Sequence, residues 1–357
     1  MKKNISVVMP VYNAENTIAE CIKSVLRSLQ DSDELIIVDD GSADNTANIC
    51  KDYAYSNNNN IIYIYQSNKG TFSARLTGLK YSKGEYISFI DADDICTDDR
   101  YYVMNSMISE YDADIFFFGA TVKKKKSISE VFNIDMPQGT YSNKEIFEQY
   151  AKLLFGRLQD DKKFCAGYVW NTLIRKEILR DLLLYEDERI QLFEDEVIMT
   201  IASLNAKKCV VSAKELYIYE HSNYNTASKK KGYWKGYWEN IVTVYKVKKK
   251  IAIINNIYDE EIQLRLATFL AKNCLRSIYN ETSYDNPKNI MQAIAYTTYI
   301  IPKELRNDIR KYEKNDLFLY ERVIIWIQLH NGGFINYFIY FLMYDRMRKF
   351  KVKKRSI

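Results

Sequence analysis

Histidine, proline and glycine are scarce in this sequence of 357 residues, with 2, 4 and 12 copies respectively. So few histidines leave little material for a histidine triad or a multi-histidine metal site, and carboxylates become the main candidates for catalysis. Six cysteines are spread along the chain without a Cys-x-x-Cys pair, which argues against a zinc site and a dense disulfide framework. We therefore expect reduced thiols and a cytoplasmic protein.

Long apolar runs are also missing. No segment approaches the roughly 20 apolar residues of a membrane span. The apolar run after the basic start is short and ends at Pro10 without a cleavage site, so we expect no signal peptide. The glycine-rich loops of dinucleotide oxidoreductases and P-loop phosphotransferases are absent too, and the segment 10–13 is not the glycine-rich loop of a sugar nucleotidyltransferase.

The net charge of +5 is concentrated at one end of the sequence. Residues 345–357 hold seven Lys and Arg against Asp345, a local charge of +6 that leaves about −1 for the remainder. An aromatic, apolar segment at 334–344 precedes them, and this pattern favours a tail that docks on the inner face of a membrane. A solvated tail is the alternative. A nucleic-acid contact would need a binding motif that the sequence lacks, so we expect no nucleic-acid partner.

Short apolar, β-branched runs alternate with segments of helical spacing in the first part of the chain. Strands are predicted at 5–9, 35–38, 61–65, 86–90 and 115–118, and helices at 14–29, 44–53, 74–79 and 98–110. Such alternation predicts an α/β fold with a mostly parallel, doubly wound sheet.

The later part of the chain has a different pattern. We expect mainly helical structure over 143–205 and helices from about residue 228, ending with 317–329 and 334–344. A domain boundary near residue 226 separates the two patterns, so the expected domains are 1–226 and a helical region at 227–357.

Polar turns follow the predicted strands at 10–13, 39–42, 68–70 and 91–94. Ligands of open α/β sheets bind beyond the carboxyl ends of the strands, so these turns are expected to meet at one crevice. Consecutive acids such as Asp91, Asp93 and Asp94 cost free energy at a buried strand end unless a cation compensates them, and Mn²⁺ or Mg²⁺ prefers such oxygen ligands. The alternative is that Asp94 or Asp98 caps the helix at 98–110.

Five segments together resemble the bacterial family 2 glycosyltransferases of GT-A fold. They are Val8–Asn13, Ile37–Ser42, Asn68–Gly70 with Ala74–Arg75, Phe89–Asp94 and Glu194–Asp195. The resemblance covers roughly residues 4–225. It implies an inverting transfer of a sugar from a nucleotide diphosphate, usually UDP, to an acceptor hydroxyl, assisted by Mn²⁺ or Mg²⁺. A non-catalytic nucleotide-sugar-binding or scaffold protein of the same fold is the alternative function.

The resemblance also implies roles on the donor side, in a nucleotide-sugar-binding half at 1–120. The matching positions that border the nucleoside are Pro10, Tyr12 and Asp39. Arg75 would lie near the nucleotide, Asp91 would face the ribose or donor sugar, and Asp93 would bind the metal. Lys69 is a further candidate for the phosphate charge, although a solvated role is its ordinary alternative. Relatives usually place Asn soon after the Arg, whereas this chain has Leu76 and Thr77.

The acceptor side of the resemblance lies at 121–226. Asp195 matches the catalytic base, with Glu194 beside it, although an exposed acidic helix turn is the alternative. Trp170 matches an acceptor-side segment, where it would stack on a sugar or pack in the core. His221 falls where some relatives supply a histidine to the metal or diphosphate, and a structural role is its alternative.

The biological setting follows from the resemblance alone. It implies assembly of a cell-surface glycan such as capsule, lipopolysaccharide or a teichoic-type polymer, with a glycan or lipid-linked acceptor. The residues do not choose the sugar or the acceptor, and they leave a homo-oligomer open.

Overall fold

The computed structural model describes residues 4–56, 60–124, 127–159, 161, 167–220, 233–281, 283, 286–288, 292–293, 296, 300–312 and 317–330. The chain divides into two compact units, Met1–Leu154 with Lys163–Ala227 and Phe155–Lys162 with Ser228–Ile357. His221 and the basic tail at 345–357 lie outside the described residues, so the roles expected of them stay predictions.

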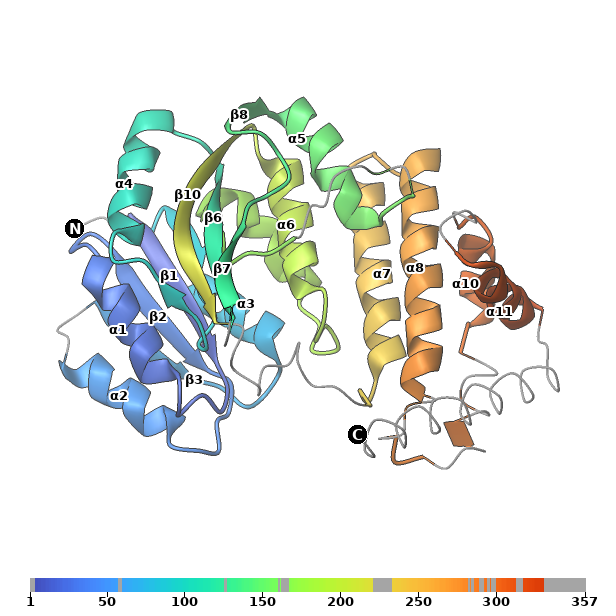
Figure 1. Cartoon of the computed structure of the whole chain (residues 1–357), viewed down its shortest axis with the longest axis horizontal. Helices are drawn as coiled ribbons and strands as arrows, with labels where there is room; N and C mark the ends of the chain where they lie inside the picture. Colours follow the sequence, from blue (N-terminus) through green and yellow to red (C-terminus); the bar gives the residue numbers. More distant parts are fainter. Residues whose placement is uncertain are drawn as a thin grey trace. The chain divides into compact units, whose positions relative to one another are not determined.

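The first unit begins with strands and helices in alternation, as the sequence predicts (Figure 1). Its first elements are β1 (Ile5–Val11), α1 (Ile18–Ser28), β2 (Glu34–Asp39), α2 (Thr46–Ser56), β3 (Ile61–Tyr65), α3 (Thr71–Tyr81) and β4 (Tyr86–Phe89). The four strands pair in parallel in the order β3-β2-β1-β4. Their carboxyl ends therefore point toward the same edge of the sheet.

The same sheet continues with strands from the later part of the first unit. The remaining elements are β5 (Ile95–Cys96), α4 (Arg100–Tyr111), β6 (Ile115–Lys124), β7 (Ser127–Phe132), β8 (Gly139–Ser142), α5 (Asn143–Gln149), η1 (Ala151–Phe155), β9 (Thr172–Arg175), η2 (Lys176–Tyr185), α6 (Glu194–Asn205) and β10 (Lys208–Glu220). Because β9 is antiparallel to both β4 and β6, β6 and its parallel neighbour β10 run in the direction of β1 to β4. The predicted mostly parallel α/β sheet is confirmed.

The expectation of mainly helical structure over 143–205 is wrong for Thr172–Arg175. This segment is the strand β9, in which Ile174 pairs with Ile87 of β4 and with Ile115 of β6. Four residues are too few to show a period in the sequence, and strands far away along the chain provide the pairing. The sequence pattern also does not predict β7, β8 or β10, which join the sheet in the same way.

Helices cover both faces of the sheet because the side chains of β1 alternate between them. Ile5, Val7 and Met9 belong to an apolar cluster with buried residues of α1 and α4. Val8 points to the other face, where α3 lies so close that a Cβ on Gly78 would be 2.3 Å from Val8 Cγ1. The sheet is therefore doubly wound, and its buried centre holds the strand ends in place.

The second unit contains the helices α7 (Tyr237–Ile254), α8 (Glu260–Glu281), α10 (Lys303–Ile309) and α11 (Leu319–Leu329). Helices α7 and α8 lie side by side, as Figure 1 shows, and α10 and α11 contact α8. The buried Arg265 of α8 binds Asp161 through two hydrogen bonds of 2.8 and 3.0 Å and the carbonyl of Gly156 at 3.0 Å. Among the described residues, no helix is long and apolar enough to cross a membrane.

Candidate active site

The polar turns after β1, β2 and β3 are joined by hydrogen bonds. The Asn13 backbone N–H donates to Ser42 Oγ at 2.9 Å, and the Ala43 N–H donates to Asn13 Oδ1 at 2.8 Å. Asp40 Oδ2 accepts from the Gly70 N–H at 2.8 Å, just before α3 begins. These turns lie at the carboxyl ends of parallel strands, so the expected convergence on one edge of the sheet is observed for them.

The carboxylates of Asp39 and Asp40 are buried and build these turns. Asp39 accepts from the Ser42 N–H at 2.9 Å and from the Tyr63 hydroxyl at 2.8 Å. Asp40 accepts from Gln66 Nε2 at 2.7 Å and from the Lys69 N–H at 2.9 Å. Both acids therefore have the turn-forming role, and a contact of Asp39 with a nucleoside stays a prediction.

Arg75 of α3 is buried at the centre of a partly buried acidic cluster. Its side chain is 3% exposed, and the guanidinium donates from Nη2 to Asp91 Oδ1 at 2.9 Å. Its Nη1 donates to Glu194 Oε1 at 3.2 Å and to Asp195 Oδ1. One side chain thus joins the acidic turn after β4 to the start of α6, more than 100 residues later in the sequence. We call Arg75, Asp91, Glu194 and Asp195 the Arg75 cluster.

Three carboxylates share one guanidinium in the Arg75 cluster, and this excess of acid changes the proton affinity of its members. Burial raises the pKa of Asp195 to about 8, because the opposing attraction of Arg75 is partly cancelled by Glu194 and Asp91. Burial also raises the pKa of Glu194. For Arg75, burial lowers the pKa, but the three carboxylates outweigh burial and hold it above its usual value. Asp195 can therefore gain or lose a proton near neutral pH.

Glu194 and Asp195 occupy the first turn of α6, where the helix dipole favours negative charge. Phe193 precedes them with a left-handed backbone at φ 64°, a conformation that residues with a Cβ adopt rarely. The Val169 N–H also donates a hydrogen bond to Asp195. The two acids thus sit in a defined position rather than on the exposed acidic helix turn that was the alternative.

The acidic turn is closed by a hydrogen bond of 3.1 Å from the Asp94 N–H to the Asp91 carbonyl. Asp94 is buried, and its Oδ2 accepts from the Tyr217 hydroxyl at 2.8 Å. The alternative for this turn, in which Asp94 or Asp98 caps the next helix, is wrong. Helix α4 begins at Arg100 with Asp99 as the N-cap residue, and Asp98 instead binds Arg27 Nε at 2.6 Å.

The donor set of this turn suits a hard divalent cation. Asp91 and Asp93 offer only oxygen ligands, and Mg²⁺ or Mn²⁺ is commonly held by one or two carboxylates with substrate phosphates and water. Within the part of the chain that the structure describes, no three acidic, histidine or cysteine side chains are grouped as a metal site. A metal at Asp93 would take its further ligands from a bound nucleotide or from residues outside that part, such as His221, and this role of Asp93 stays a prediction.

The other donor-side candidates lie around the same edge. Pro10 is buried within β1, and Tyr12, which follows β1, is half exposed. Lys69 is exposed, and its Nζ lies 3.1 Å from Glu188 Oε1. Its charge is thus shared with a carboxylate, and its contact with phosphate stays a prediction.

Trp170 packs inside an aromatic cluster on the acceptor side. Only 6% of it is exposed, and its ring stacks with Tyr168 at a centroid distance of 5.1 Å and with Tyr217 at 4.6 Å. This arrangement favours the packing alternative for Trp170. Tyr168 is the more exposed ring of the stack, at 38%. Stacking of Trp170 on an acceptor sugar stays a prediction.

Sequence reasoning misses two buried residues of the site. Tyr217 contacts the acidic turn through its hydroxyl, and Arg100 of α4 donates to the carbonyls of Trp170 at 2.8 Å and Leu216 at 3.1 Å. Tyr217 is one of 30 tyrosines and lies in a strand that no pattern predicts. No sequence signal would have selected either residue.

Comparisons with known proteins identify the family of this chain. The sequence model of the family described as "Glycosyl transferase family 2" matches residues 6–183. Glycosyltransferase GlyG of Streptococcus pneumoniae is 31% identical over 229 residues, which cover 61% of this chain and 71% of GlyG. Glycosyltransferase GlyA of the same species is 29% identical over 218 residues, which cover 60% of this chain and 30% of GlyA.

Longer relatives and solved structures extend the comparison. The minor teichoic acid biosynthesis protein GgaB of Bacillus subtilis is 26% identical over 265 residues, which cover 74% of this chain but 28% of GgaB. The chain thus spans less than a third of GlyA and of GgaB. The crystal structure of residues 1–349 of S. aureus TarS with UDP has a TM-score of 0.60 at 18% identity, covering 92% of this chain and 88% of that one. This likeness shows the GT-A fold.

Proposed function

The chain belongs to glycosyl transferase family 2, and from this premise we propose that it transfers a sugar from a nucleotide diphosphate, expected to be UDP, to an acceptor hydroxyl with inversion. The observation that carries the proposal is the Arg75 cluster. It joins Asp91, at the turn expected to hold the donor, to Asp195, the candidate base on the acceptor side. A donor-side candidate and an acceptor-side candidate are thus bound to the same guanidinium.

Asp195 has the properties that the base of a direct displacement needs. The acceptor hydroxyl oxygen forms a bond to the anomeric carbon, and its proton passes to the Asp195 carboxylate. The bond from the anomeric carbon to the diphosphate oxygen breaks, and its electron pair leaves with the diphosphate. A pKa of about 8 places Asp195 close to the pH at which a general base works best. Arg75 holds Asp195 and Asp91 in a fixed relation.

A bound Mn²⁺ or Mg²⁺ would offset the charge of the departing diphosphate. Asp93 is the residue that we propose holds it, with His221 as the further candidate that the resemblance implies. We expect UDP to bind at least about tenfold more tightly in Mn²⁺ than in EDTA, and an Asp93→Asn variant to lose most of that difference. Calorimetry gives both affinities, and equal affinities with and without EDTA would contradict the metal role.

Turnover is the test of the reaction itself. A panel of UDP-sugars, including hexoses and N-acetylhexosamines, should give metal-dependent release of UDP with at least one donor. The complexes of TarS with UDP and UDP-GlcNAc support this choice of donors. Binding of UDP-sugars without turnover of any of them would favour the alternative function, a non-catalytic nucleotide-sugar-binding or scaffold protein.

The setting that we propose is the synthesis of a cell-surface polysaccharide in the cytoplasm, on a glycan or lipid-linked acceptor. The name of GgaB, a teichoic acid biosynthesis protein, supports this class of product for the present chain. A lipid-linked acceptor would be presented at a membrane surface. The enzyme would then need a way to approach that surface.

Helix α11 offers a surface for this approach. Ile324, Ile325 and Leu329 are buried on one of its faces, whereas Leu319, Val323 and Trp326 follow helical spacing on the other and are exposed. A helix that is apolar on both faces is ordinarily covered on both. We propose that an anionic lipid surface covers the exposed one, because the sequence that follows is aromatic and then carries a local charge of +6 at 345–357.

Vesicle sedimentation tests this docking surface. We expect the protein to sediment with vesicles that contain anionic lipid and not with neutral ones, and Trp326→Gln to reduce the bound fraction several-fold. The matched control is Tyr102→Gln, which changes an exposed aromatic residue on α4. Sedimentation that is equal for both variants would contradict the proposal, and a dimer that dissociates on Trp326→Gln would assign the face to a second copy instead.

A further inference from the structure

Tyr217 of β10 is buried and touches the acidic turn at two points. Its hydroxyl donates to Asp94 Oδ2 at 2.8 Å and accepts from the Asp91 backbone N–H at 3.2 Å. Burial raises the pKa of this hydroxyl well above its ordinary value, so it keeps its proton. The hydroxyl therefore acts as a donor toward the Asp94 carboxylate and as an acceptor toward Asp91, with both directions defined.

The ring of Tyr217 is held by its neighbours. The guanidinium carbon of Arg100 lies 5.2 Å from the ring centroid, and the Trp170 ring stacks on it at 4.6 Å. Arg100 is itself fixed by hydrogen bonds to the carbonyl of Trp170 and to Ser88 Oγ of β4. A hydroxyl on such a ring has little freedom to move, so it sets the position of the groups that it bonds.

Asp91 is fixed through its other atoms as well. Its carbonyl accepts from the Asp94 N–H at 3.1 Å and from Cys21 Sγ at 3.5 Å, and its carboxylate binds Arg75. The Tyr217 hydroxyl adds the contact that ties the first acid of the turn to the last. Asp93 lies between these two tied residues, so the position of its backbone is restricted by theirs.

We propose that Tyr217 is a positioning residue, whose hydroxyl orients the acidic turn so that Asp91 and Asp93 face the nucleotide-sugar donor. This inference rests on the proposed function, because it assumes that a nucleotide sugar binds at the turn. Tyr217 does not touch the substrate. It acts through the backbone of Asp91 and the carboxylate of Asp94, while its ring stacks on Trp170 of the acceptor side.

The Tyr217→Phe variant tests the inference because it removes the hydroxyl and keeps the ring. We expect the KM for the donor and the Kd for UDP with Mn²⁺ to rise roughly tenfold, as for the loss of a hydrogen bond to a charged group, while kcat changes less than about threefold. The matched control is Tyr86→Phe. Tyr86 is equally buried, and its hydroxyl donates to the Ala113 carbonyl at 2.9 Å, away from the acidic turn.

Hydrogen exchange of the protein without nucleotide is the second measurement. We expect faster exchange at the amides of 91–94 in Tyr217→Phe and no change there in Tyr86→Phe. Unchanged exchange at 91–94 would overturn the positioning role whatever the protein binds. An equal rise of the donor KM in both variants would also overturn it, since a general loss of stability would then explain the effect. Absence of UDP binding by the wild-type protein, with faster exchange in the variant, would instead overturn the proposed function.

Discussion

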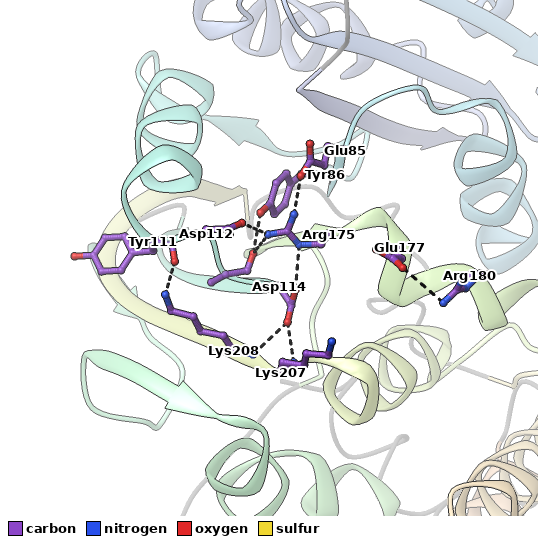
Figure 2. Close-up of polar contacts among 11 residues, drawn as sticks. Glu85, Tyr86, Tyr111, Asp112, Asp114, Arg175, Glu177, Arg180, Lys207 and Lys208 are labelled. Carbon is purple, nitrogen blue, oxygen red and sulfur yellow. Dashed lines mark hydrogen bonds and ion pairs between the residues drawn. The ribbon is translucent and has the colours of Figure 1, made fainter.

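Two clusters of this protein have the same composition and lie at opposite ends of β4. In the Arg75 cluster, one arginine binds three carboxylates beyond the carboxyl end of β4. At the other end of β4, Arg175 binds Glu85 at 2.6 Å, Asp114 at 3.0 Å and Asp112 (Figure 2). We call this second group the Arg175 cluster. Each cluster contains one guanidinium and three acids, so their composition does not distinguish them.

The acids of the two clusters differ in their exposure to solvent and in their hydrogen bonds to the backbone. In the Arg175 cluster, the Asp112 side chain is 86% exposed, and Asp114 accepts from the backbone N–H groups of Lys207 and Lys208 at 2.7 and 3.2 Å (Figure 2). Water and backbone donors thus compensate those acids, and Asp114 ties the start of β6 to the start of β10. The acids of the Arg75 cluster are 17–30% exposed, below Glu85 and Asp112 of the Arg175 cluster although not below Asp114, which is 16% exposed. Burial raises the pKa of Asp195 and Glu194. We infer that the Arg175 cluster stabilises the fold and that the Arg75 cluster takes part in the proposed reaction.

The largest difference between the two clusters is expected when one acid of each loses its charge. Asp195→Asn should lower kcat by about 10³-fold, because an amide cannot accept the proton of the acceptor, while UDP affinity stays within about threefold. Asp112→Asn, the matched change in the Arg175 cluster, should leave kcat within about twofold. Steady-state kinetics and calorimetry measure these quantities. Retained sugar transfer in Asp195→Asn would remove the distinction between the clusters.

A second pair of variants keeps the charge of each arginine and changes the geometry of its hydrogen bonds. Arg75→Lys loses the planar fork that binds three acids at once, and we expect kcat/KM to fall by about 10²-fold through misplacement of Asp91 and Asp195. Arg175→Lys removes the same fork at the other end of β4 and should leave kcat/KM within about twofold. Steady-state kinetics with varied donor concentration measure kcat/KM for both variants. Equal losses would show that the fork at Arg75 has no special role.

The pH dependence sharpens the comparison further. Since the free enzyme needs Asp195 without its proton, kcat/KM should rise by up to about tenfold per pH unit below pH 8 and level off above it. Stability should change in the opposite sense. The folded state keeps a proton on Asp195 between its unfolded pKa of about 4 and about 8, so the free energy of unfolding falls as pH rises through that window.

Asp195→Asn supplies the control for this pH effect. Without a titrating group at position 195, the free energy of unfolding should depend less on pH between about 4 and 8. Urea denaturation at several pH values measures it. A variant with the same pH slope as the wild-type protein would assign the slope to other groups.

The smallest effect is expected from loss of the Arg175 charge. Arg175→Gln should lower the free energy of unfolding by about 1–2 kcal/mol, because Glu85 and Asp112 are exposed and Asp114 keeps its backbone hydrogen bonds, and leave the kcat of the folded protein within about twofold. Urea denaturation and kinetics on the same preparation test this. A large loss of kcat in a protein of normal stability would contradict the structural role of the Arg175 cluster.

Local sequence patterns predict the first half of the sheet well. The strands β1 to β4 and the helices between them show their periods within the chain, because each buries one stripe or one run of apolar side chains. The polar turns after these strands are equally visible. The short strands β7 to β9 and the long strand β10 are not predicted, because pairing with distant strands, rather than a local period, makes them part of the sheet.

The sequence by itself, through its strand ends and its resemblance to the family, singled out the acidic turn at 91–94 and the pair Glu194–Asp195 as candidate site residues. Only the tertiary structure decided that Arg75 joins them, that Asp94 turns inward to Tyr217 rather than capping α4, and that Trp170 lies within a stack. The physical reason is the range of the interactions. Strand and helix periods are local, whereas a buried charge is compensated by whichever partner the fold brings near, and Glu194 and Asp195 lie more than 100 residues from Arg75 in the sequence.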